Sequence, residues 1–360
     1  MKVLVVTVVH HPQDARIRAR QIECLLARDV QISLAAPFED FQVEELDTRV
    51  KPINLPRAKG TKRMLALRAA SKLITRSSLE FDLVLIHDPE LIFAARKSKV
   101  PVIWDVHEDT SAALSMKSWL PGIFKIPAKL LIRYLERYAE KKFTLILAES
   151  SYQNRFKKKK RIVPNTTLVK PLKNVADRSS VIYLGTISSA RGGYELIELA
   201  KKLQSFDITV ELIGLCGEPQ LEVALIDLNN SATLRWYGFM PNVEALNLLQ
   251  GAIAGLSLLH DQPNYQHSQP TKIFEYLAAG LPVITTNNPA AAQLVTKANC
   301  GFIVNFHEVD AVVEAVTKLR DDAQLRRTLG NNGYEYVLTN HSWDKDQEVF
   351  LSAIEDALAK

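Results

Sequence analysis

The sequence predicts an α/β fold made of two doubly wound parallel sheets. Short β-rich runs alternate with helical patterns along the chain, as in proteins built from βαβ units. The alternation stops at the polar segment 170–180 and then restarts, and 360 residues exceed what one ordinary core accommodates. The absence of low-complexity tracts and short repeats in the sequence argues against a solenoid or a propeller.

The first half of the chain contains five β-rich runs. A helix is expected from about Asp14 to Arg28, between the first two runs. Strands are expected at residues 3–9, 30–36, 82–87, 100–106 and 145–150. The first run is too short to span a membrane and lacks a small-residue cleavage site, so it is interpreted as a buried strand.

The second half repeats the pattern with six runs. Strands are expected at 181–187, 208–214, 233–238, 253–260, 282–286 and 301–304. Before the fifth of these runs, the stretch HSQPTKIFEYLAAG predicts a helix of about ten residues that starts near Ser268 and stops at Gly280. Lys272 and Glu275 share one face of this helix, either as a surface ion pair or as part of a ligand site.

Composition bounds the class of protein. Hydrophobic residues make up 47% and charged residues 24%, which is ordinary for a globular protein. The three separated cysteines predict reduced thiols, so we expect a cytoplasmic protein. The net charge of +5 is unevenly distributed, because residues 117–161 carry 13 Lys and Arg against 3 Asp and Glu.

Polar clusters follow four of the expected strands, where open parallel sheets bind ligands. They are His10–Arg16, His87–Leu91, His107–Thr110 and Ser188–Gly193. Within them, Asp14 and Asp88 are interpreted first as helix caps rather than as catalysts. His107 differs, because Asp109 or Thr110 can serve as the cap and leave its imidazole free to face a ligand.

The stretch Arg191-Gly192-Gly193 at a helix start resembles a phosphate cradle, although an ordinary glycine turn has the same sequence. A GxGxxG after the first strand and a GxxxxGK[ST] are both missing from the sequence, which argues against nicotinamide enzymes and P-loop NTPases. The acidic residues of Asp344–Asp346 suit a helix N-terminus. We therefore expect no metal and no cofactor.

Nine short motifs occur in a fixed order along the chain. They are HPQDARI, HDPEL, DVHED, VPN, YLGTISSARG, YGFMP, SQPTKIFEYLAAGLPVI, NCGFIV and NHSWD. With them, the chain resembles the family 4 glycosyltransferases, which are retaining, nucleotide-sugar-dependent enzymes of the GT-B type, and in particular the bacterial polysaccharide and lipid-linked glycan branch. PTKIFEYLAAGLPVI is the most specific of the motifs, and their order argues against chance similarity.

The resemblance implies a GT-B fold, in which two Rossmann-like domains face each other across a cleft. It implies an acceptor-binding N-terminal domain over 1–170 and a nucleotide-sugar-binding domain over 171–341. The final helix, 342–360, would pack back on the N-terminal domain.

The resemblance also implies roles for single residues. Glu275 would hold the nucleotide ribose, and Lys272 and Arg191 would meet the diphosphate, with Gly192 in the same loop. His107 would reach the donor sugar, so the implied catalytic residues are His107, Arg191 and Lys272. Both cations suit a leaving diphosphate, and a carboxylate can accept two hydrogen bonds from a ribose.

Two positions depart from the family pattern. Many members carry two glutamates eight apart, and His267 stands where the first would be. His267 would then either take over the donor-sugar contact or be an exposed residue before the Ser268 cap. Many members also have an arginine where this chain has Thr186. The loops after the first strands supply further candidates for the acceptor side or the cleft. These are His10, Asp14, Arg16 and His87.

The implied reaction is retaining transfer of a sugar from a nucleotide-diphosphate sugar to a hydroxyl of a glycan or lipid-linked acceptor. UDP is the commonest base in the family, and the departing phosphate would help to take the acceptor proton. A nucleotide-sugar 2-epimerase and a non-catalytic nucleotide-sugar-binding protein are the alternatives. These classes differ in product, because the first would isomerise the donor and the second would only bind it.

The basic region 117–161 raises the question of a charged partner. In Ser118–Phe143, basic residues recur every fourth position beside leucines, which favours peripheral contact with an anionic membrane on the inner face of the cell membrane. A solvated helix face is the plain alternative. Without aromatic-basic interleaving or a recognised reading module, we expect no nucleic-acid partner.

Overall fold

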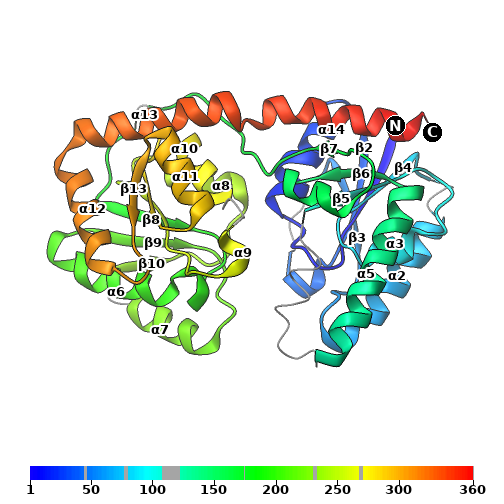
Figure 1. Cartoon of the computed structure of the whole chain (residues 1–360), viewed down its shortest axis with the longest axis horizontal. Helices are drawn as coiled ribbons and strands as arrows, with labels where there is room; N and C mark the ends of the chain where they lie inside the picture. The colour runs from blue at the N-terminus through cyan, green and yellow to red at the C-terminus, as the bar shows by residue number, and fades with distance from the viewer. Residues whose placement is uncertain are drawn as a thin grey trace. The chain divides into compact units, whose positions relative to one another are not determined.

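The computed structural model describes residues 1–43, 47–76, 80–107, 122–173, 175–229, 233–266 and 271–359. The chain divides into two compact units (Figure 1). Unit 1 comprises Met1–Asn165 together with Asp344–Lys360, and unit 2 comprises Thr166–Trp343. The last residues of the chain therefore belong to the unit that contains the first.

Unit 1 is built on a parallel sheet of seven strands in the order β3-β2-β1-β4-β5-β6-β7. The inner strand β1 pairs with β2 and β4, with Val3 opposite Ile32 and Leu83. The strands are β1 Lys2–Val6, β2 Gln31–Ala36, β3 Val50–Asn54, β4 Leu83–Ile86, β5 Val102–Val106, β6 Thr144–Leu147 and β7 Arg161–Ile162.

Helices cover this sheet. The longer ones are α2 Arg63–Arg76, α3 Leu91–Ala95, α5 Gly122–Lys142 and α14 Trp343–Leu358, and Figure 1 shows α2, α3 and α5 together along the sheet. These three helices share one hydrophobic core with the strands, which includes Trp104 and Phe156. The unit also contains α1 Glu23–Leu26 and the short turns η1 Ala15–Ile22, η2 Glu39–Phe41, η3 Gly60–Lys62 and η5 Ser150–Arg155.

Unit 2 contains a parallel sheet of six strands in the order β10-β9-β8-β11-β12-β13. One core packs α6, α7 and α12 on the sheet, and a second packs α8, α10, α11 and α13, so the unit is doubly wound. The strands are β8 Ser180–Leu184, β9 Thr209–Ile213, β10 Leu234–Trp236, β11 Gly255–Ser257, β12 Val283–Thr286 and β13 Gly301–Val304. The helices and turns are η6 Ser189–Arg191, α6 Gly193–Leu203, η7 Gln204–Phe206, α7 Pro219–Asn229, α8 Asn242–Leu249, α9 Pro263–Gln266, α10 Thr271–Ala278, α11 Pro289–Ala298, α12 Val309–Asp321 and α13 Ala323–Asn340.

The predicted fold class is confirmed, and each of the eleven predicted strands is present. Two edge strands were not predicted. β3 carries Pro52, which removes a backbone donor and is tolerated at a sheet edge, and β7 is only two residues long. The helix expected from Asp14 begins as the π-helical turn η1 and becomes α-helical at Glu23.

The thiol groups and the apolar character of the helices can be compared with the expectations from the sequence. Cys24, Cys216 and Cys300 are all free thiols. Among the described residues, none of the helices combines the length and the apolar character needed to cross a membrane.

Candidate functional site

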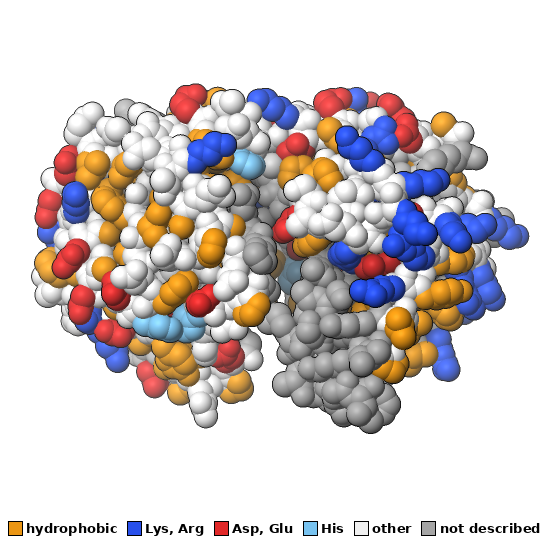
Figure 2. Space-filling model, in the orientation of Figure 1, with side chains coloured by type: hydrophobic (Ala, Val, Ile, Leu, Met, Phe, Trp, Pro, Cys, Tyr) orange, Lys and Arg blue, Asp and Glu red, His pale blue; other side chains and the backbone are white. Residues whose placement is uncertain are grey.

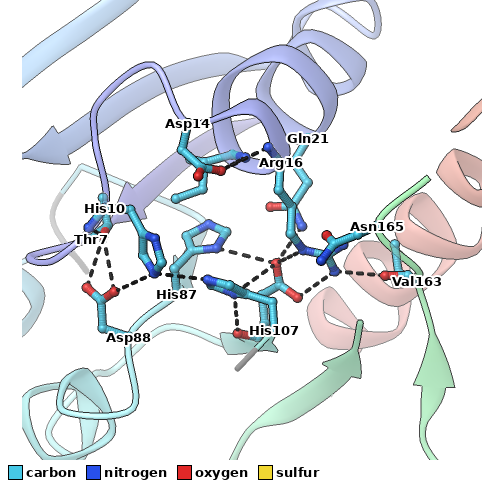
Figure 3. A network of polar contacts seen from close by, with 12 residues as sticks. Thr7, His10, Asp14, Arg16, Gln21, His87, Asp88, His107, Val163 and Asn165 are labelled. Carbon is cyan, nitrogen blue, oxygen red and sulfur yellow. Dashed lines mark hydrogen bonds and ion pairs between the residues drawn. The ribbon is translucent and has the colours of Figure 1, made fainter. Parts of the chain in front are cut away.

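A buried polar network lies at the carboxyl ends of β1, β4 and β5 in unit 1 (Figure 3). These three strands are neighbours in the sheet, so the loops that follow them meet. Asp88 follows β4 and accepts hydrogen bonds from the Thr7 hydroxyl at 3.0 Å and from the Val8 backbone amide. The interpretation of Asp88 as a helix cap is therefore wrong, because its carboxylate binds the chain that leaves β1.

Two histidines extend the network from Asp88. The Nε2 atom of His10 lies 3.2 Å from Asp88 Oδ1 and 3.0 Å from Nε2 of His107. The Nδ1 atom of His107 lies 3.2 Å from the Asp105 carbonyl oxygen, which can only accept, so Nδ1 donates and Nε2 accepts from His10. The imidazole of His107 is thus hydrogen-bonded rather than free. Burial lowers its pKa to about 4, so it is neutral at neutral pH.

Asp105 holds the other half of this network. Arg16 forms a bidentate pair with it, with both N–O distances at 2.7 Å, and Gln21 donates to it at 2.7 Å. Arg16 is buried and donates further to the carbonyl oxygen of Val163 and the side chain of Asn165. The guanidinium of Arg16 is therefore held within the fold of unit 1.

The remaining candidates of unit 1 lie around the same network. Asp14 accepts from the backbone amides of Arg16 and Ile17, which confirms it as the cap of η1. His87 is buried, with Nδ1 3.4 Å from Asp105 Oδ2. The structure thus brings His10, His87 and His107 together, while Asp14 and Arg16 shape the loop beside them.

A second candidate site lies in unit 2, where α10 faces the end of β8. Lys272 is 6% exposed, and its Nζ atom lies 3.6 Å from the centre of the Tyr183 ring. Nζ has no hydrogen-bond partner among the described residues, and it lies beside Gly185. Burial, and then the charge of Arg191, hold the pKa of Lys272 well below its ordinary value, although Glu275 opposes this.

Glu275 lies on the next turn of α10. It is 5% exposed, and its Oε1 atom accepts a hydrogen bond of 2.9 Å from the side-chain amide of Asn242. It also lines a cavity of about 80 Å³ together with apolar residues such as Val243 and Leu246. Because Lys272 and Glu275 are both buried, the interpretation of the two as a surface ion pair is wrong.

Arg191 and Gly192 form the turn that precedes α6. Gly192 has a φ of +82°, and a Cβ added there would lie 2.4 Å from the carbonyl oxygen of Leu258. Both facts require glycine at this position. The turn holds Arg191 near enough to Lys272 and Tyr183 for its charge to lower the pKa of the lysine.

Several predicted residues lie outside the described part of the chain. These are His267 and Ser268 before α10, and Asp109 and Thr110 after His107. Thr186, which stands in place of a family arginine, is exposed.

Sequence reasoning missed residues that position these candidates. Asp105 is a carboxylate inside an apolar strand, and this unusual placement was the one available signal. Tyr183, Asn242 and Thr7 carry no such signal, because their partners are about 30 to 90 residues away in the sequence.

A further surface feature lies on α5 in unit 1. Leu130, Leu131 and Tyr134 are 60%, 59% and 67% exposed, and Arg133 is exposed beside them. Exposed lysines follow at residues 157–159. Figure 2 shows Lys and Arg side chains gathered over unit 1, with hydrophobic side chains among them. Arg137 and Lys160 are paired with Glu140, so only part of the basic region is unpaired surface charge.

Comparison with known protein families places the chain. A family model described as "Glycosyl transferases group 1" matches residues 165–336, and one described as "Glycosyltransferase Family 4" matches residues 19–168. The chain belongs to glycosyltransferase family 4. The residues of this family member that surround Lys272 fall within the first match. In the unit 1 network, His87, Asp105 and His107 fall within the second match, whereas Thr7, His10, Asp14 and Arg16 precede it.

Individual relatives agree with this family membership. The capsular polysaccharide biosynthesis glycosyltransferase CapM of Staphylococcus aureus is 26% identical over 193 residues, which are 51% of this family member and 49% of CapM. The chain thus spans about half the length of the curated relative that it matches.

Solved structures share the fold along nearly the whole chain. Sucrose-phosphate synthase from Thermosynechococcus elongatus superposes with a TM-score of 0.73 at 16% identity, covering 99% of both chains. Anabaena HepE in complex with UDP-glucose gives a TM-score of 0.70 at 13% identity, covering 99% of this family member and 100% of HepE. At these identities the likeness concerns the fold, which is GT-B.

Proposed function

We propose that this family member transfers a sugar from a nucleotide-diphosphate sugar, with UDP as the nucleotide, to a hydroxyl of a glycan or lipid-linked acceptor. The observation that carries the proposal is the buried Nζ of Lys272, which has no hydrogen-bond partner among the described residues. A buried ammonium without an anion is costly, so a bound anion at this point is strongly favoured.

The charges around Lys272 support a diphosphate as that anion. Arg191 lies close enough to lower the pKa of Lys272, so two cations share one small region. A leaving diphosphate gains negative charge as the sugar departs, and both cations stabilise it. The turn at Gly192 brings backbone amides and the start of α6 to the same region.

Glu275 supports a nucleoside beside the diphosphate. A ribose offers two neighbouring hydroxyl donors, and a carboxylate can accept from both. Glu275 is already oriented by Asn242 and borders a cavity with apolar walls. HepE is described in complex with UDP and with UDP-glucose, which makes uridine our choice of base.

His107 is our proposed contact to the transferred sugar. It is neutral, and its Nδ1 donates to Asp105, so a sugar hydroxyl would donate to Nε2 in place of His10. We propose retention at the anomeric carbon, with the departing phosphate taking the acceptor proton. Positioning and electrostatic stabilisation then supply the catalysis.

A product assay tests this proposal. The protein is incubated with UDP-, GDP- and ADP-sugars and a crude lipid and glycan acceptor fraction, and the products are separated. A new glycoside from a UDP-sugar, with the anomeric configuration of the donor, supports the proposal. An isomerised donor would instead identify a 2-epimerase, and binding without turnover would identify a nucleotide-sugar-binding protein.

We further propose that α5 attaches unit 1 to an anionic membrane surface. Exposed Leu130, Leu131 and Tyr134 provide apolar area, and Arg133 and the lysines at 157–159 provide charge complementary to acidic lipids. Such attachment suits an acceptor carried on a lipid. Sedimentation with neutral and anionic vesicles tests it, and equal binding to both would remove the electrostatic part.

A further inference from the structure

Glu195, His260 and His307 form a cluster in unit 2 that the proposed transfer reaction does not use. Glu195 lies in the first turn of α6, His260 three residues after β11, and His307 three residues after β13. The Nε2 atom of His260 lies 2.8 Å from Glu195 Oε1, and the Nδ1 atom of His307 lies 2.7 Å from the same oxygen. The three ligand atoms lie within 4.8 Å of one another.

The hydrogen bonding of this cluster is uneven. Both imidazoles converge on Oε1, while Oε2 of Glu195 is buried and has no partner among the described residues. Oε2 therefore keeps its acceptor capacity for a further ligand. Two imidazole nitrogens and a carboxylate oxygen gathered this closely form a donor set that can hold a metal ion.

From this cluster we infer that Glu195, His260 and His307 form a binding site for a divalent transition-metal ion such as zinc. Two histidines and one glutamate form a common three-ligand set for zinc, with the remaining position open or taken by water. Oε2 is available as a second carboxylate ligand. A cavity of about 10 Å³ beside Glu195 and His307 has room for about one water molecule.

The present distances need only a small adjustment to admit the ion. Metal–ligand bonds of about 2.0–2.2 Å separate ligand atoms by about 3.0–3.4 Å, depending on the coordination angle. The observed separations of 2.7 and 2.8 Å must therefore widen by a few tenths of an ångström. His307 is 62% exposed at its side chain and can rotate freely enough to do so. Binding also requires the ring protons to move to His260 Nδ1 and His307 Nε2, so that the ligating nitrogens present lone pairs.

The ion would act as a clip within unit 2. It would tie the first turn of α6 to the segments that follow β11 and β13. Gly192 and Arg191 lie directly before α6, and the amide of His260 donates to the carbonyl oxygen of Ala190. The clip would thus hold the turn that carries Arg191.

The test is metal binding to the full-length protein, freed of metal by chelation and carrying no histidine tag. Calorimetric titration with Zn²⁺ should show one binding site. Glu195→Gln, His260→Gln and His307→Asn should each lower the zinc affinity at least tenfold. Losing a hydrogen-bond partner of a ligand already costs roughly 10- to 100-fold in affinity, and losing the ligand itself costs more. Asparagine is chosen at His307 because it tolerates the positive φ of 64° found there. Glu198→Gln, on the exposed side of the same helix, is the matched control and should bind as the wild type does.

A cobalt absorption measurement and a variant of the other candidate metal cluster complete the test. Co²⁺ should give visible absorption bands in the wild type that the three ligand variants lack, and Mg²⁺ should not compete, because it prefers oxygen ligands. His107→Ala must retain the site, since His87, Asp105 and His107 form the other group able to hold a metal among the described residues. The inference would be overturned if His107→Ala lost zinc binding while His260→Gln kept it. It would also be overturned if the wild type bound no stoichiometric zinc. Glu195, His260 and His307 would then be a hydrogen-bonded cluster without a metal.

Discussion

Lys272 is the residue on which the donor site depends most. Replacing it with methionine keeps the volume of the side chain and removes the charge, so we expect turnover to fall roughly 10²- to 10³-fold, as when one stabilising contact to a leaving group is lost. Steady-state kinetics with a UDP-sugar measures this. Lys201→Met, at an exposed lysine on α6, is the matched control. Near-normal kcat in Lys272→Met would contradict the diphosphate assignment.

The lowered pKa of Lys272 also predicts a proton linkage. In the free protein the lysine loses its proton at a pH well below its ordinary 10.5, because it is buried and near Arg191. A bound diphosphate raises this pKa, so UDP binding should take up a proton at pH values between the two pKa values. Calorimetry in buffers of different ionisation enthalpy measures the uptake. Lys272→Met should abolish it, and proton release by the wild type would refute the linkage.

His107 predicts the response of stability to mild acid. Its pKa is lowered from 6.5 to about 4 in the folded protein. The contribution of His107 to folding stability is therefore fully present above pH 6.5 and is lost as the pH falls from 6.5 towards 4. At pH 5 the loss from this group is about 2 kcal/mol relative to pH 7. Urea unfolding at both values measures it. His11, with a pKa also near 4, adds to the wild-type slope, so His107→Gln should remove only part of the difference.

At the scale of elements, the turn before α6 depends on Gly192. An alanine there combines a positive φ with a Cβ 2.4 Å from Leu258 O, so the turn must move. We expect Gly192→Ala to cost more than about 1 kcal/mol of stability and to weaken donor binding by displacing Arg191. Gly217→Ala meets open space and serves as the control in thermal unfolding and UDP titration. Equal behaviour of the two variants would contradict this account of the turn.

The surface of α5 gives a second element-scale prediction. Arg133→Glu should weaken binding to anionic vesicles about tenfold or more, because it removes one favourable charge of about 1 kcal/mol and adds an unfavourable one. Leu131→Ser should weaken it at all salt concentrations, because apolar area is lost. Val223→Ser, an equally exposed apolar position on α7 in unit 2, is the control. Vesicle sedimentation against salt separates the two effects.

Elements were predictable from sequence to different degrees. Most of the eleven predicted strands are buried apolar runs with a plain signal, whereas β3 contains the exposed Lys51 and Pro52 and resembles a loop in sequence. The π-helical turn at Ala15–Ile22 was not predicted, and Asp105, the partner of its buried Arg16, lies 89 residues away in the sequence. The sites followed the same rule. Lys272 and Glu275 stood in one motif, while Glu195, His260 and His307 are joined only by the fold.

At the scale of the whole molecule, α14 belongs to unit 1. Arg28 pairs with Glu348 and Arg161 pairs with Asp356, and Phe350 is fully buried. Phe350→Ala should therefore cost unit 1 about 3–5 kcal/mol and leave unit 2 unchanged. Hydrogen exchange read by mass spectrometry follows each unit separately. Leu358→Ala, at an exposed position of the same helix, is the control, and faster exchange confined to unit 2 would be the contrary result.

The return of the chain to unit 1 constrains the order in which the two units can fold during synthesis. Unit 2 is inserted within unit 1, and the backbone enters and leaves it at adjacent points, where the Trp343 amide donates to the Thr167 carbonyl oxygen at 2.9 Å. During synthesis, β1 to β7 leave the ribosome first but lack α14 until unit 2 has been completed. Unit 2 can therefore fold as soon as it emerges, while unit 1 must wait with an uncovered surface for the last residues of its own structure.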